Sequence, residues 1–83
     1  MATMGAIIMI TLQKALNVYN RKNVNLQMRT YRDKKNTYLG MCDFVDGELV
    51  GDDRFHLEDE VLMWEAPEEN KMIVWLKNYN GKY

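Results

Sequence analysis

Length, composition and charge place this chain among small folded domains. Its 83 residues are 47% hydrophobic and 28% charged, with five Gly and one Pro, and these ordinary globular values exclude a disordered or fibrous chain. The net charge of −1 hides a split, because residues 1–42 carry seven bases and one acid, whereas residues 43–83 carry eleven acids and four bases. Such a split closes on itself within one fold, joins copies of the chain, or provides one face for anions and another for basic partners.

The N-terminal segment and the single cysteine bear on the cellular location. The apolar run at residues 4–10 follows no basic residue and spans seven positions, far short of the roughly 20 needed to cross a bilayer. We therefore expect no signal peptide and no membrane contact. Residues 1–8 are either an extension before an internal start at Met9 or part of the fold. Cys42 has no second cysteine to pair with, which favours a reducing cytoplasm.

The clearest element is a helix that begins after Thr11, a residue type that caps helix N-termini. Its apolar positions follow the i, i+3, i+4, i+7 spacing of one buried stripe. They are Leu12, Ala15, Leu16 and Tyr19. The helix is expected to end within residues 20–23, and residues 6–10 are either a buried strand or an earlier turn of the same helix.

The next segments predict strands and hairpins. Residues 24–31 alternate apolar and polar side chains, which is typical of a half-buried strand. A loop at residues 33–36 then leads into a return strand at residues 37–45, with Leu39 and Met41 inward. The other face of that strand is expected to carry Tyr38, Cys42 and Phe44. Asp46-Gly47 is a two-residue hairpin signal and predicts a short strand at residues 48–50, broken by the Gly-Asp-Asp that follows.

A second hairpin is predicted near the C-terminus. Its arms are residues 60–66 and 71–78, joined by a Pro-Glu-Glu-Asn turn at residues 67–70. Trp64 and Trp75 are expected to face each other across the two arms and to form the centre of the core, where an aromatic pair adds about 0.5–1 kcal/mol.

Together these elements predict one α+β domain over residues 1–83, with one short helix packed on a mainly antiparallel sheet of four to five strands. Residues 79–83 are expected to be a frayed tail or a contact between copies. A chain this short buries only roughly 60% of its unfolded surface. We therefore expect a homo-oligomer.

The basic half contains a candidate site for an anion or a nucleotide. Alternation places Arg29 and Tyr31 on one exposed face, where a guanidinium and a ring can flank a phosphate-bearing base. The full set is Arg29, Tyr31, Arg32, Lys34 and Lys35. The alternative is a solvated hairpin whose charges prevent edge-to-edge aggregation.

The acidic half contains a candidate surface for a basic partner. Eight of the eighteen residues at 43–60 are acidic, and we expect five of them to bind the partner. These are Asp52, Asp53, Glu58, Asp59 and Glu60. A calcium loop is excluded because Val50 and Leu57 occupy ligand positions. The alternative is a solvated acidic face that pairs with the basic half.

Metal-binding and catalytic motifs are missing from the sequence. His56 and Cys42 stand at no metal-ligand spacing, and no nucleophile motif surrounds either residue. We expect no metal, no cofactor and no enzymatic activity. Strand methionines are expected to fill the core, or else to form an adaptable partner surface. They are Met28, Met41, Met63 and Met72.

The helix "TLQKALNVYN" and the terminal pair "LEDEVLMWEAPEENKMIVWLKN" resemble, in layout, the small α+β accessory proteins of bacteriophages and mobile elements. This resemblance implies a protein that binds and blocks a host or defence protein, as anti-CRISPR proteins do. The leading hypothesis is therefore a non-enzymatic, cytoplasmic inhibitor that acts through its acidic surface. The second hypothesis is a protein that binds or sequesters a small anionic ligand such as a nucleotide.

Overall fold

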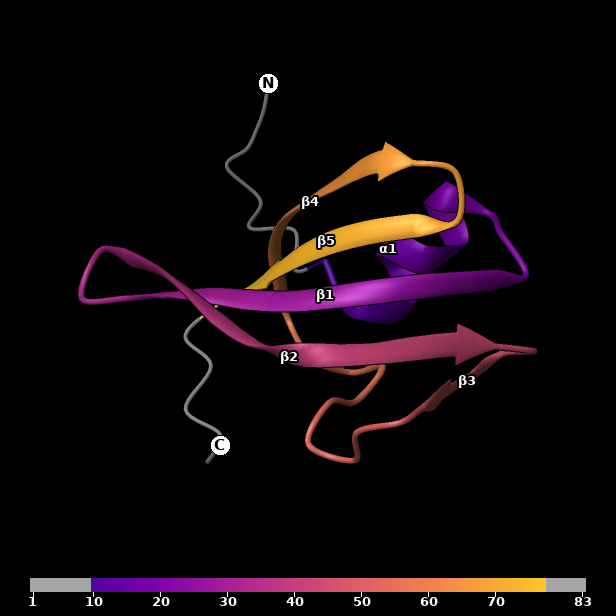
Figure 1. Ribbon diagram of the computed structural model, residues 1–83, viewed down its shortest axis with the longest axis horizontal. Coiled ribbons are helices and arrows are strands. Elements are labelled where there is room, and N and C mark those ends of the chain that lie inside the picture. The colour runs from indigo at the N-terminus through magenta and orange to yellow at the C-terminus, as the bar shows by residue number, and fades with distance from the viewer. Residues whose placement is uncertain (1–9, 78–83) are drawn as a thin grey trace, which may run out of the picture.

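The computed structural model describes residues 10–77, which form a helix layer on a five-stranded sheet (Figure 1). The elements are α1 (Leu12–Tyr19), β1 (Asn23–Arg32), β2 (Lys35–Val45), β3 (Glu48–Val50), β4 (Val61–Glu68) and β5 (Lys71–Leu76). The sheet order is β3-β2-β1-β5-β4. Only β1 and β5 are parallel. The predicted α+β class is confirmed, whereas the expectations for residues 1–8 and 79–83 lie outside the described residues.

Helix α1 forms as its spacing predicts. The Thr11 hydroxyl accepts a hydrogen bond from the backbone N–H of Lys14, and Asn20 ends the helix in the left-handed region at φ 57°. Ile10 lies outside the helix, where its carbonyl accepts a 2.7 Å hydrogen bond from the Val61 N–H. The Tyr19 hydroxyl lies near the turn between β4 and β5 and donates to the Glu68 carbonyl at 3.1 Å.

The core lies between α1 and the sheet. Alternate residues of β1 point toward the helix, and hydrophobic side chains of every layer surround them. The buried cluster is Leu12, Ala15, Leu16, Val24, Leu26, Met28, Leu39, Cys42, Phe44, Phe55, Val61, Met72, Val74 and Leu76. Thr30 is also buried and donates its hydroxyl to the Leu76 carbonyl at 2.7 Å, so its polar atom is satisfied.

Two-residue turns close both hairpins of β2. Asp46 and Gly47 have φ values of 50° and 86°, as the hairpin signal predicts. Asp33 and Lys34 have φ values of 50° and 67° and join β1 to β2 in the same way. The expected loop at residues 33–36 is therefore too long by two residues. Asn36 belongs to β2, where it pairs with β1.

A bulge changes which residues of β2 are buried. Leu39 has no partner in β1, and the register shifts there. Alternation restarts after this extra residue, so Cys42 and Phe44 are buried while Met41 is 48% exposed. The expectation that Met41 points inward, with Cys42 and Phe44 on the other face, is wrong for this reason.

Glycine is required at the bulge. Gly40 has a φ of +152°, and a Cβ there would lie 2.7 Å from Nη2 of Arg54. That nitrogen donates to the Leu39 carbonyl at 3.0 Å. The bare glycine therefore lets Arg54 connect the segment after β3 to the bulge.

The terminal hairpin has a shorter turn than expected. Glu68 pairs directly with Lys71, and Asn70 adopts a φ of 63°. Pro67 therefore lies inside β4 rather than in the turn. Because β4 is an outer strand of the sheet, a residue without an N–H is tolerated there.

The two tryptophans lie on opposite sides of the sheet. Trp64 pairs with Val74, and Trp75 pairs with Met63. Trp64 contacts Tyr19 on the helix side, with ring centroids 5.9 Å apart. The expected Trp64–Trp75 pair is wrong, because the register of β4 and β5 shifts the two residues by one position relative to each other.

Candidate binding surface on the helix-free face

The side of the sheet opposite α1 is called the helix-free face. Its central row crosses four strands, because residues directly opposite each other in a sheet present their side chains on one side. The row consists of Tyr38, Arg29, Trp75 and Met63. It contains a guanidinium between two aromatic residues.

Arg29 is held by neutral hydrogen-bond acceptors. Its Nε donates to Oδ1 of Asn36 at 2.7 Å, and its Nη1 donates to Oε1 of Gln27 at 3.0 Å. The guanidinium carbon lies 5.7 Å from the Tyr38 ring centroid. The Trp75 indole N–H also donates to Oδ1 of Asn36, at 3.0 Å. Two hydrogen bonds and one ring contact therefore fix the orientation of the guanidinium.

The charge of Arg29 is not neutralised by this network. Within residues 10–77 no carboxylate forms an ion pair with it. The side chain is only half-buried. Its remaining N–H groups are thus able to donate to an anion that approaches from solvent.

The hairpin of β1 and β2 extends beyond the rest of the sheet (Figure 1). Tyr31 lies on this arm, on the same side as Arg29 and opposite Asn36. Tyr31 and Tyr38 are 42% and 49% exposed, so both rings are accessible. Lys34 lies in the turn at the tip of the arm.

The structure therefore divides the predicted anion-binding residues. Arg29 and Tyr31 share the helix-free face, as their alternation predicts. Arg32 and Lys35 pair with each other, and alternation places them on the opposite side of the arm. All three predicted cations of the arm, Arg32, Lys34 and Lys35, are exposed near its tip.

The sequence does not predict three residues that surround Arg29 on the helix-free face, namely Gln27, Asn36 and Trp75. Gln27 follows the same alternation as Arg29 and could have been found by that signal. The sequence predicts Asn36 in a loop, because the expected turn is two residues longer than the observed one. It predicts Trp75 in the core beside Trp64, and no sequence pattern connects Trp75 to Arg29.

Two predicted partner-binding acids form internal ion pairs. Asp52 accepts from Nε of Arg54 at 2.9 Å. This side-chain hydrogen bond holds the pKa of Asp52 below its usual value. Glu60 lies 3.4 Å from Nζ of Lys77. These two carboxylates are therefore already occupied by cations of the same chain.

The other three predicted acids differ in their exposure to solvent and in their hydrogen bonds. Asp59 accepts a 2.9 Å hydrogen bond from the backbone N–H of His56 and so closes a local turn. Asp53 and Glu58 are exposed. Of the five acids predicted to bind a partner, these two project most fully into solvent.

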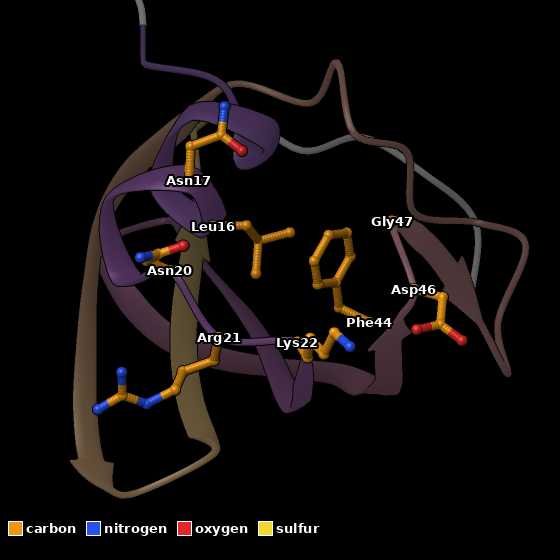
Figure 2. Close-up of a pocket in the computed structure, with 8 residues that line it drawn as sticks. All are labelled: Leu16, Asn17, Asn20, Arg21, Lys22, Phe44, Asp46 and Gly47. Atoms are coloured by element: carbon orange, nitrogen blue, oxygen red, sulfur yellow. The ribbon is translucent and has the colours of Figure 1, made fainter.

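A hollow of about 500 Å³ lies between the C-terminal end of α1 and the turn from β2 to β3. Figure 2 shows Leu16 and Phe44 pointing toward each other across it, while Arg21 points away. The Arg21 guanidinium lies 5.1 Å from the Tyr19 ring centroid. Lys22 and Asp46 stand on the rim, and their opposite charges favour neither an anion nor a cation.

The sulfur-containing residues of the strands differ in burial. Cys42 is 3% exposed, and burial, followed by the nearby Asp52 carboxylate, raises its pKa to about 12. The thiol is therefore protonated at neutral pH, which opposes a nucleophilic role. Met28 is fully buried in the core, as expected. Met41 and Met63, however, are exposed on the helix-free face.

The described residues form neither a metal centre nor a membrane-spanning helix. Across residues 10–77, no three His, Cys, Asp or Glu side chains come together as a metal site would require. In the same part of the chain, no helix combines the length and apolar character needed to span a membrane.

Comparison of the chain with protein-family models, curated proteins and solved structures finds no significant match.

Proposed function

We propose that this protein is a non-enzymatic binding protein whose helix-free face takes a nucleotide-type ligand, an anion that also carries an aromatic ring. The observation that supports this proposal is the state of Arg29. Its guanidinium is oriented by Asn36 and Gln27, and no carboxylate in the described part of the chain pairs with it.

The chemistry of each group follows from its position. A phosphate accepts hydrogen bonds from the outward N–H groups of Arg29, whose planar fork suits phosphate oxygens. The exposed rings of Tyr31 and Tyr38 provide faces on which a base stacks, a contact worth about 1–3 kcal/mol per base. The cations near the arm tip attract the anion at longer range.

The acidic surface supports a second candidate function, in which the protein docks a basic groove of a host or defence protein and inhibits it. Asp53 and Glu58 are the exposed acids that favour it. We rank this candidate below nucleotide binding because Asp52 and Glu60 are paired within the chain.

Fluorescence anisotropy with a labelled nucleotide panel at low salt tests the proposal. We expect Arg29→Gln and Tyr31→Ala each to weaken binding at least tenfold, which is about 1.4 kcal/mol. Lys14→Gln is the matched control, because Lys14 is exposed on α1, away from the helix-free face. Circular dichroism melts establish that each variant is folded.

The charge-reversal pair Asp53→Lys and Glu58→Lys separates the two candidates. Nucleotide binding is expected to survive this change or to strengthen slightly. If Arg29→Gln binds as well as the wild type, the nucleotide proposal is wrong. Loss of capture of a basic protein by the charge-reversed variant would then favour the acidic surface.

A further inference from the structure

A second hollow lies beside Arg29 on the helix-free face. Its volume is about 300 Å³, and its lining includes Asn25, Gln27, Met41, Ile73 and Pro67. Gln27 belongs to both features, because its Oε1 accepts the hydrogen bond from Nη1 of Arg29. A ligand held at Arg29 therefore has this hollow next to it.

The two amides of the hollow have fixed orientations. Arg29 is only a donor, so Gln27 presents its oxygen to Arg29 and its NH₂ group is left for a ligand. Asp43 is only an acceptor, and the Asn25 NH₂ group donates to it at 3.1 Å, which leaves the Asn25 oxygen. These two amides thus offer one oriented donor and one oriented acceptor.

Two walls of the hollow are apolar, and a third is formed by the exposed Glu68–Lys71 ion pair, whose charged atoms lie 3.9 Å apart. Met41 and Ile73 are the direct partners of Gln27 in the neighbouring strands, one on each side. A flat ring placed over Gln27 therefore lies between a thioether and a branched aliphatic side chain. Apolar walls with a few oriented polar groups are typical of sites that recognise small planar groups.

Spacing connects the hollow to the phosphate position. Gln27 and Arg29 are two residues apart on β1, which is about 6.6 Å along a strand. That distance is comparable to one sugar–phosphate unit. The accessible Tyr38 ring lies opposite Arg29, and the accessible Tyr31 ring lies two residues farther along β1. The face therefore contains more base-binding positions than one nucleotide can fill.

We infer that the ligand is a single-stranded nucleic acid, and that the hollow lined by Asn25 and Gln27 takes the base next to the phosphate bound at Arg29. This inference rests on the proposed function. A paired base cannot insert its hydrogen-bonding edge, so the strand must be unpaired at this position. Because both amides are oriented, affinity is expected to depend on the base that occupies the hollow.

The test compares a labelled mononucleotide, four single-stranded homohexamers and a hexamer duplex, with the wild type and Asn25→Leu. Asn23→Leu is the matched control, because Asn23 is an exposed amide of β1 outside the hollow. We expect the best hexamer to bind at least tenfold more tightly than the mononucleotide or the duplex. We also expect Asn25→Leu to reduce the differences among hexamers, whereas Asn23→Leu leaves those differences unchanged.

Several outcomes separate the inference from the proposed function. Equal affinity for mononucleotide and hexamers, duplex binding as tight as that of the single strand, or unchanged hexamer preference in Asn25→Leu overturns the inference alone. Displacement of the hexamer by polyglutamate at equal charge concentration also overturns it. Failure to bind any of the nucleic acids or the mononucleotide overturns the proposed function itself.

Discussion

Cys42 is a residue whose acidity the fold changes strongly. It lies in β2 among core side chains, and burial raises its thiol pKa from an ordinary 9.0 to about 12. The carboxylates of Asp52 and Asp43 act in the same direction. Both effects disfavour a thiolate, so the folded state keeps the proton that the unfolded chain loses.

We predict that Cys42 makes stability fall as the pH rises above about 9. The unfolded thiol ionises near 9.0, whereas the folded thiol does so near 12. Unfolding therefore releases a proton in this window, and the contribution that is complete below pH 9 is lost as the pH approaches 12. Urea unfolding of the wild type and Cys42→Ala from pH 8 to 10.5 measures the difference. A pH-independent difference would contradict the prediction.

Single residues also show what the sequence could indicate about the site. The shared face of Arg29 and Tyr31 is predictable because alternation in a strand is a local signal. The orientation of Arg29 was not predictable, since it depends on Asn36 across the hairpin and on the length of a turn. Trp75 joins through a hydrogen bond to Asn36, 39 residues away in sequence.

At the scale of elements, the two tryptophans of the terminal hairpin have unequal roles. Trp75 is 6% exposed, and its indole N–H bonds to Asn36 of β2. It therefore connects β5 to the hairpin arm. Trp64 is half-buried and contacts Tyr19 of α1.

We predict that Trp75→Ala destabilises the domain by about 3–5 kcal/mol, as expected for truncation of a buried large side chain. Trp64→Ala is its matched control and is expected to cost less, because part of that ring already contacts water. Chemical denaturation monitored by circular dichroism measures both. Equal losses, or a larger loss for Trp64→Ala, would contradict this order.

The elements themselves were largely predictable, but their faces and neighbours were not. Helix α1 and the strand periods come from local spacing. The bulge at Leu39 changes the faces of the β2 residues that follow it, Met41, Cys42 and Phe44, whereas Leu39 is buried as expected. Gly40 inside the strand is a local sign of this bulge. The parallel pairing of β1 with β5 joins segments that are distant in the sequence. Local patterns predict hairpins between neighbouring strands and do not indicate such a pairing.

For the whole molecule, exposed apolar surface concentrates on one side. The helix-free face carries most of the large exposed hydrophobic side chains. These include Tyr31, Tyr38, Met41, Val50 and Met63. On the outer strand β4, Leu62 is also 51% exposed. A surface of this kind on a small domain favours contact with a ligand or with another copy.

We predict that the protein self-associates, with β4 as the contact between copies, because closed two-fold assemblies are the commonest. Sedimentation at micromolar concentration is expected to give a mass above 9.8 kDa. Leu62→Asp is expected to return it to the monomer, whereas Val18→Asp, an exposed change on α1, leaves the mass unchanged. A monomeric wild type at low salt would remove this prediction.

The parallel pair of β1 and β5 at the centre of the sheet also determines when the sheet can finish folding during translation. Thr30 of β1 and Leu76 of β5 bond to each other although 46 residues separate them. A nascent chain can form α1 and the first hairpin early, but β1 lacks its second neighbour until β5 has left the ribosome. In that interval one edge of β1 is unpaired, as in folding intermediates that aggregate. Such non-local pairing also slows folding, so translation speed after β3 is expected to influence the yield of native protein.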